Sequence, residues 1–253
     1  NMSGHSKWST IKRAKGATDA KRGVTFTKLG NAITIASKLG NSGDPDSNPR
    51  LRMALEEARS VNMPKENIQR AIDKGLGNLP GQNLEEITYE GFGPAKAAFF
   101  VEVVTDNKLR TLAEMKNLFD RSGGALGANG STAYMFKKTG EIKVSTKDGN
   151  SEDEILEIID GGAEDVEEFD EEGKAKYLVY TDPTSFSSVL DYLKKQEFIV
   201  ESAEIIMKPT IFTEVTDKEK AEKVLNFIEK LEDRDDVQKV YANFDISDDL
   251  MTE

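Results

Sequence analysis

Eight basic residues and one indole stand near the start of this 253-residue chain, and their types suit the binding of phosphate groups. Between residues 2 and 39 the only acid is Asp19, although the whole protein carries a formal net charge of −12. Lysine and arginine neutralise phosphates, and an indole can stack on a base. The predicted nucleic-acid-binding residues are Lys7, Trp8, Lys12, Arg13, Lys15, Lys21, Arg22 and Lys28.

Other interpretations of this run stay open. A solvated, lysine-rich tail would have the same composition, and Trp8 would serve equally well as an anchor that holds the tail on the folded body. His5 is the only histidine of the chain, so a Ser–His catalytic pair would have to use this segment. No spacing of carboxylates singles out one pair for hydrolysis. We therefore predict no catalytic residues and no enzymatic activity.

The charge of the chain is divided between two parts. Residues 2–77 contain fourteen bases and seven acids, whereas the remainder contains 20 bases and 39 acids. A basic module attached to an acidic body indicates that one end meets a polyanion while the other stays off it. Residues 152–172 alone hold twelve acids and no base. Such a run typically makes a solvated face, so we predict neither a metal site nor a cofactor.

The composition is that of an ordinary folded protein. At 37% hydrophobic and 8% aromatic residues, the chain has enough apolar material for two or three domains. No apolar run approaches the roughly 20 residues of a membrane span, and the polar, basic start lacks the apolar core of a signal peptide. The absence of cysteine excludes disulfides and thiolate ligands. We expect a cytoplasmic protein without a membrane partner.

Three helices are predicted in the basic part of the chain. Apolar residues recur at steps of three and four over residues 26–36, which is typical of an amphipathic helix. Asn48 and Pro49 supply a cap and a first helical residue for a second helix, and Pro64 begins a third. Short helices of this kind bury their apolar stripes only by packing together. We therefore predict a helical domain over residues 2–77.

Strands and helices alternate beyond this domain. From residue 141 to residue 205 their order is βαββαβ, which is typical of a ferredoxin-like unit. The α/β segments on either side are each incomplete, so we predict that residues 83–137 and 209–253 form one discontinuous domain and that residues 138–208 form an acidic domain inserted into it. The expected class is α+β: an N-terminal three-helix domain followed by two ferredoxin-like α/β domains, the third domain inserted in the second.

A glycine-rich loop, residues 122–131, is the other conspicuous feature. Its glycines would let the backbone approach a phosphate, but the loop lacks the Gly-Lys-Ser/Thr ending of a P-loop. We expect either a constrained connection or a backbone surface that docks on a large partner. A strand is predicted directly after the loop, over residues 132–136. Farther along, Thr216 and Glu219 form a capping box that begins a helix.

Eight short motifs, spread over essentially the full chain, form a specific combination. They are Gly4-His5-Ser6-Lys7-Trp8, Lys21-Arg22-Gly23, Phe26-Thr27-Lys28-Leu29, Gly43-Asp44-Pro45-Asp46-Ser47-Asn48-Pro49-Arg50-Leu51-Arg52, Asn62-Met63-Pro64-Lys65, Tyr89-Glu90-Gly91-Phe92-Gly93-Pro94, Thr105-Asp106-Asn107 and Gly130-Ser131-Thr132-Ala133-Tyr134. In these motifs the chain resembles the YebC family of bacterial proteins and their mitochondrial translational-activator relatives.

The resemblance implies three domains and a non-enzymatic role in gene expression. Bacterial members are described as transcriptional regulators that bind DNA, so the leading hypothesis is a DNA-binding regulator that uses a basic N-terminal domain. Other members are linked to the ribosome and to relief of stalling, and the alternative is a ribosome-associated translation factor that binds ribosomal RNA. An acidic body is awkward for wrapping duplex DNA, and a small basic wedge suits an RNA crevice at least as well.

Overall fold

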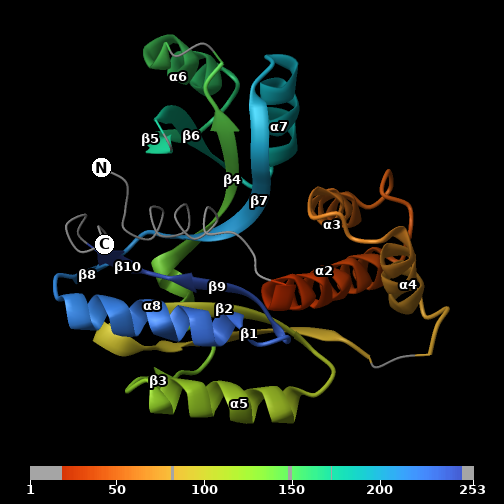
Figure 1. The fold of residues 1–253 in the computed structure, drawn as a ribbon, viewed down its shortest axis with the longest axis vertical. Coiled ribbons are helices and arrows are strands. Elements are labelled where there is room, and N and C mark those ends of the chain that lie inside the picture. Colours follow the sequence, from red (N-terminus) through yellow and green to blue (C-terminus); the bar gives the residue numbers. More distant parts are fainter. Residues whose placement is uncertain (1–18, 81–82, 148–149, 172, 247–253) are drawn as a thin grey trace. The chain divides into compact units, whose positions relative to one another are not determined.

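The computed structural model describes residues 19–80, 83–147, 150–171 and 173–246, with side chains from residue 24 onward (Figure 1). The chain divides into two compact units, a smaller one built from residues 136–210 and a larger one built from the described residues on either side. Helices precede α/β segments with antiparallel sheets, which confirms the predicted fold class. The three-domain map with its residue bounds stays a prediction.

Three helices begin the described part of the larger unit: α2 (Asp19–Gly40), α3 (Pro49–Ser60) and α4 (Lys65–Gly75). Figure 1 shows them in red and orange. The apolar stripes that the spacing predicts meet in one core, in which Ile33, Leu51 and Ala58 are completely buried. Because each helix is short, this shared core supplies most of its stability.

Asn48 holds the junction between α2 and α3. Its Oδ1 accepts a hydrogen bond from the Leu51 amide at the start of α3 (3.1 Å), as the Asn48–Pro49 pattern predicts. Its Nδ2 donates to the Ala36 carbonyl of α2 (2.9 Å). The residue is only 5% exposed, so removal of its side chain would leave the Leu51 amide without its partner and would break the link to the Ala36 carbonyl.

We expect Asn48→Ala to lower the free energy of unfolding by about 2 kcal/mol, because a helix cap and a buried hydrogen bond are lost together. Urea denaturation followed by circular dichroism measures this difference. Asn67→Ala is the matched control, since Asn67 lies exposed on α4 and should change the free energy by less than about 0.5 kcal/mol. Equal effects of the two substitutions would show that Asn48 does not bridge the helices.

The α/β part of the larger unit is assembled from two separated stretches of chain. The first stretch contains β1 (Glu85–Phe92), η1 (Pro94–Lys96), β2 (Ala98–Thr105), α5 (Lys108–Arg121), β3 (Ala125–Leu126) and η2 (Ala133–Met135). The second contains β8 (Thr213–Val215), α8 (Lys218–Glu232), β9 (Val237–Ala242) and β10 (Phe244–Ile246). The main sheet has the strand order β3-β1-β2-β9 and is antiparallel, while β8 and β10 form a small parallel pair.

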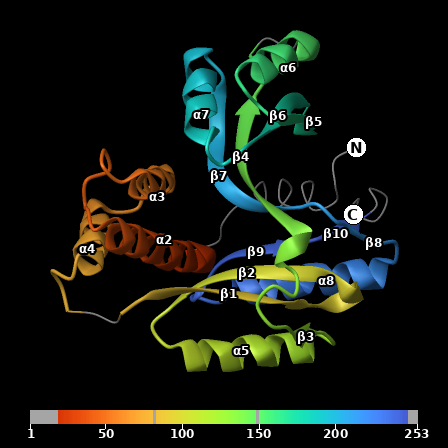
Figure 2. The same ribbon diagram turned by 180° about the vertical axis from the view of Figure 1, so that it is seen from behind.

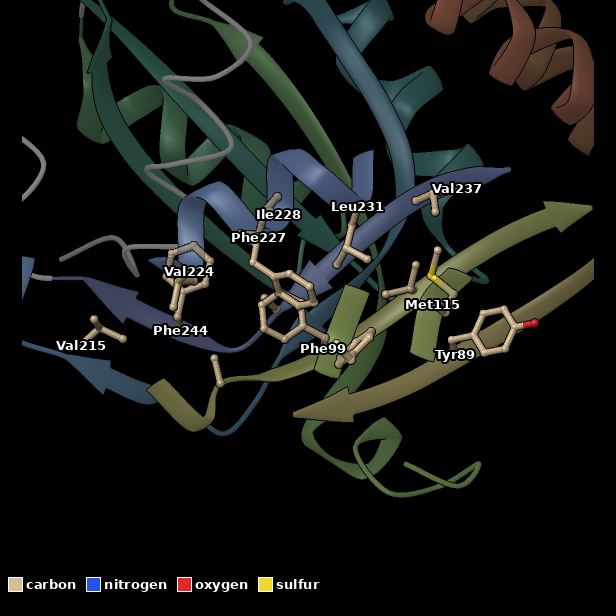
Figure 3. Close-up of a cluster of buried hydrophobic side chains, with 14 of the residues drawn as sticks. Tyr89, Phe99, Met115, Val215, Val224, Phe227, Ile228, Leu231, Val237 and Phe244 are labelled. Atoms are coloured by element: carbon tan, nitrogen blue, oxygen red, sulfur yellow. The ribbon is translucent and has the colours of Figure 1, made fainter. Parts of the chain in front are cut away.

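Both α5 and α8 cover one face of this sheet. Phe119 of α5 and Phe227 of α8 each meet Phe99 of β2 edge to face, with ring centroids 6.1 and 4.9 Å from that of Phe99. Phe119 and Phe227 also contact each other at 5.0 Å. Figure 3 shows Phe99 and Phe227 in the centre of the buried cluster. Aromatic contacts of this geometry add to the stabilisation from burial, so this cluster fixes the spacing of the two helices.

A buried amide joins the two stretches of chain. The Asn243 side chain accepts a hydrogen bond from the Ala98 amide (2.7 Å) and donates to the Ile211 carbonyl (3.0 Å). Asn243 is 1% exposed, and its main-chain amide donates to the Ala98 carbonyl (3.1 Å). Residues that are far apart in the sequence are thereby held in one sheet region.

The smaller unit has the predicted βαββαβ order. Its elements are β4 (Phe136–Ser145), α6 (Ser151–Asp160), β5 (Asp165–Glu171), β6 (Lys174–Thr181), α7 (Phe186–Lys195) and β7 (Ile199–Pro209). The antiparallel strand order is β5-β6-β4-β7, which is that of a ferredoxin-like sheet. Figure 2 shows β4 and β7 running together from behind. The first and last residues of the unit's strands, Phe136 and Pro209, are ladder partners.

The acidic run of the smaller unit is only partly solvated, which differs from the expected solvated face. Glu154 of α6 is 2% exposed and accepts hydrogen bonds from the Lys147 amide and the Tyr177 hydroxyl, both at 2.7 Å. Burial, together with the Glu154 carboxylate, raises the pKa of Tyr177. Glu171 pairs with Lys143, whose side chain is 6% exposed. Some of these acids therefore hold the unit together.

Two element boundaries differ from the sequence prediction. Residues 133–135 form a 3-10 turn. The strand predicted over residues 132–136 therefore begins only at Phe136. The helix cap of α8 is Asp217, whose Oδ1 accepts a hydrogen bond from the Lys220 amide (2.9 Å), and not Thr216. Aspartate is the better cap of the two, which accounts for the shift by one residue.

Candidate nucleic-acid interface

Most of the predicted nucleic-acid-binding residues lie outside the described part of the chain. This holds for Lys7, Trp8, Lys12, Arg13 and Lys15. Lys21 and Arg22 have their main chain in α2, but their side chains are not among those described. Only Lys28 can be placed in full, so the assignment of these eight residues to an interface stays a prediction.

Lys28 has a structural contact. Its Nζ donates a hydrogen bond to the main-chain carbonyl of Glu232, the last residue of α8. A cation at the C-terminal end of a helix satisfies a carbonyl that has no partner within the helix and interacts favourably with the helix dipole. A phosphate would have to draw Lys28 away from this carbonyl, so its contribution to binding is smaller than that of a free lysine.

Five further cations of α3 and α4 extend the basic surface. Unlike the nearby Arg50, which pairs with Glu86, none of them forms a side-chain hydrogen bond or ion pair within the described part of the structure. We refer to this set as the helical-region cations; they are Arg52, Arg59, Lys65, Arg70 and Lys74. The sequence prediction named bases of the first 39 residues only and missed these.

The helical-region cations are grouped by helix geometry. Arg52 and Arg59 are seven residues apart and therefore lie on the same flank of α3, beside the stripe that packs in the core. Arg70 and Lys74 are four residues apart and share one side of α4. All except the half-buried Lys74 are exposed. A polyanion that contacts this part of the larger unit would meet several charges without first breaking an ion pair.

The glycine-rich loop has its amides occupied from within the protein. Glu90 of β1 is 4% exposed, and its carboxylate accepts hydrogen bonds from the main-chain amides of Gly130, Thr132 and Ala133, each at 2.7 Å. Burial by itself would raise the pKa of Glu90, but these amide hydrogen bonds outweigh it and hold the pKa below its ordinary value. The donors that could cradle a phosphate therefore already hold an internal anion.

The same loop is anchored to β1 along its backbone. Ala125 and Leu126 form β3 and pair with the end of β1, and the Gly127 amide donates to the Glu90 carbonyl (2.8 Å). Gly124 lies so close to the Phe92 carbonyl that a Cβ atom would clash with it, and Gly130 has a φ of +87°. These contacts match the expectation of a constrained connection.

Two other kinds of site are absent from the described residues. Over those ranges, no group of three or more histidine, cysteine, aspartate or glutamate side chains is arranged to hold a metal ion. In the same part of the chain, no helix is long and apolar enough to cross a membrane. The helical-region cations and the filled glycine-rich loop are therefore the features that bear on the sequence prediction.

The fold defines a class of protein in which an N-terminal helical region precedes mixed α/β units. Two family models match the chain: the TACO1/YebC protein N-terminal domain over residues 6–78, and the TACO1/YebC second and third domain over residues 84–244. Together they cover most of the sequence. The chain therefore belongs to the TACO1/YebC family, which confirms the resemblance found in its motifs.

Relatives of similar length share this assignment. A protein of Chlorobaculum parvum is 50% identical over 99% of this chain and 98% of its own length, and one of Syntrophomonas wolfei is 44% identical over 99% of both. Both are named "Probable transcriptional regulatory protein". A crystal structure of a conserved hypothetical protein from Aquifex aeolicus is 41% identical, with a TM-score of 0.82 over 93% of this chain and 95% of that one.

Proposed function

We propose that this protein is a non-enzymatic regulator of gene expression that binds nucleic acid through its basic N-terminal region. The observation that carries the proposal is the concentration of bases in residues 2–77, fourteen against seven acids, in a protein of net charge −12. The helical-region cations support it, because they are available to phosphates without the loss of an ion pair. The names of the relatives support a role in transcription. We therefore take DNA as the leading candidate partner.

Ribosomal RNA is the second candidate partner. The 39 acids that follow residue 77 would repel a duplex that wrapped around the protein, whereas a basic end can enter an RNA crevice while an acidic body stays outside. In addition, the described part of the chain contains no pair of helices arranged to read the two half-sites of a DNA operator. Co-sedimentation with ribosomes at graded salt, beside binding to duplex DNA, separates the two partners.

Binding to nucleic acid should weaken steeply with salt. If about five phosphates are contacted on duplex DNA, the slope of log K against log salt should be near −4 to −5, from roughly 0.9 released counterions per phosphate. Fluorescence anisotropy with a labelled duplex, measured between about 50 and 200 mM salt, gives the slope.

A slope near zero would contradict the proposed electrostatic interface. The fragment of residues 78–253 provides a second measurement, since it lacks the basic region and should not bind the duplex. Full affinity of that fragment would place the interface outside the N-terminal region.

A further inference from the structure

A hollow of about 570 Å³ lies between α5 and α8, on the helix-covered side of the larger unit's sheet. We call it the α5–α8 hollow. Its volume falls within the range of small-molecule sites and is much larger than a single ion needs. None of its lining residues was named as a binding residue from the sequence, and it is separate from the helical-region cations, which lie on α3 and α4.

The lining follows from helix periodicity. Along α8 the contributing residues are spaced by three, four or seven, so they form one face of that helix, and α5 contributes its last turn in the same way. Pro94 of η1 completes the wall. Phe227 also lines the hollow, and its packing against Phe119 sets the distance between the two helices that form it.

The charged residues of the hollow are mainly basic. Four cations, Arg121, Lys223, Lys230 and Arg234, line it with a single acid, Asp233. Of the four, only Lys223 has an ion-pair partner among the described residues, the exposed Glu219 on its own helix. In a protein with a large excess of acids, three lining cations that form no ion pair among the described residues can take an anion from outside.

Helix dipoles alone do not explain this arrangement. Bases are favoured in the last turn of any helix, which accounts for Arg121 and Lys230. Lys223, however, lies in the N-terminal half of α8, and Arg234 lies beyond its last residue. The feature these four share is the hollow that they line, not a place in a helix.

We propose that the α5–α8 hollow binds one phosphate-bearing nucleotide unit of a single-stranded nucleic acid. The cations would hold the phosphate, and Leu118 and Pro94 offer an apolar wall for the sugar or base, which an unpaired strand can present and a duplex cannot. This inference rests on the proposed function and adds a second contact to it, on the sheet domain. The hollow would give the otherwise acidic body one defined contact with the nucleic acid.

The test uses the full-length protein and a labelled single-stranded RNA of mixed sequence. The hollow variant carries Arg121→Gln, Lys230→Gln and Arg234→Gln, and the control variant carries Lys116→Gln, Lys194→Gln and Lys195→Gln, which are exposed, unpaired in the described structure and outside the hollow. All six positions are exposed, so both variants should melt like the wild type. We expect about tenfold weaker binding by the hollow variant and a salt slope smaller by about 0.7, which corresponds to the loss of one phosphate contact on a single strand.

The possible results of this test distinguish failure of the hollow site from failure of the proposed function. Equal binding by the hollow and control variants, with normal binding by the wild type, would overturn this inference and leave the proposed function intact. No binding of this RNA by the wild type would overturn this inference, and the proposed function would fall with it only if the wild type also failed to bind duplex DNA. Adenosine monophosphate distinguishes the source of the phosphate: if it binds the wild type and not the hollow variant while RNA binding is equal in both, the site takes a free nucleotide and the assignment to a strand is wrong.

Discussion

Glu90→Gln should lower the free energy of unfolding by about 3 kcal/mol, although it changes only one oxygen to an amide group. The carboxylate accepts three main-chain hydrogen bonds at 2.7 Å in a position that is 4% exposed. A glutamine presents an NH2 group to some of those amides, so buried donors face another donor. Hydrogen bonds to a charged acceptor are the stronger kind, and their loss leaves the desolvation cost of the donors uncompensated.

The effect of Glu90→Gln should depend on pH in a defined direction. The pKa of Glu90 in the folded state lies below its ordinary value of 4.5, so the folded protein favours the ionised form. The stabilisation is therefore fully present at neutral pH, begins to fall as the pH drops below the unfolded-state value, and is lost as the pH passes through the folded-state pKa. The difference between wild type and variant should shrink in acid.

Urea denaturation at neutral and acidic pH measures both quantities. Glu86→Gln is the matched control on the same strand, because Glu86 forms an exposed ion pair with Arg50 and its loss should cost less than about 1 kcal/mol. Hydrogen exchange adds a local readout, since the Gly130, Thr132 and Ala133 amides should exchange faster in the Glu90 variant. If both variants unfold alike at every pH, the carboxylate does not anchor the loop.

Combined reversal of three N-terminal charges should nearly abolish binding to nucleic acid. Lys12→Glu, Arg13→Glu and Lys21→Glu together change the charge of the basic region by six and replace attraction to phosphates by repulsion. We expect the affinity at low salt to fall by at least about a hundredfold, because each lost phosphate contact also removes its counterion release. Fluorescence anisotropy with duplex DNA and with RNA measures the loss.

A control with the same total charge change separates local from global electrostatics. Lys116→Glu, Lys174→Glu and Lys195→Glu lie on exposed, unpaired positions of the described acidic body and should weaken binding only slightly. The N-terminal variant should retain the melting temperature of the wild type, since these charged residues are not part of the apolar stripe over residues 26–36. A melting temperature lower by about ten degrees would show that these bases are structural.

Local signals in the sequence were sufficient to predict the helical region. The steps of three and four in the apolar residues, together with Asn48 before Pro49, predict where the stripe and the cap lie, and the structure places both accordingly. The βαββαβ order was predictable for the same reason, because each element has its own period. Patterns that depend only on neighbours in the sequence can be recognised without knowledge of the fold.

Features that depend on distant residues were not predictable in this way. Thr132 and Ala133 donate to Glu90, which precedes them by more than forty residues, and this contact explains why the strand expected there begins only at Phe136. The α5–α8 hollow is likewise lined by residues of two helices that are more than a hundred positions apart in the sequence. The burial of Glu154 on α6 could not be predicted either, because it depends on Tyr177 of β6.

The ladder pair of Phe136 and Pro209 has a consequence for how this protein can diverge. The smaller unit is joined to the chain through two strand ends that are neighbours, and the hydrophobic clusters described for the larger unit contain only that unit's own residues. We therefore expect that the charge and sequence of residues 136–210 can change without a compensating change in the other core. Chimaeras that exchange this unit between relatives, with junctions at these two positions, should fold.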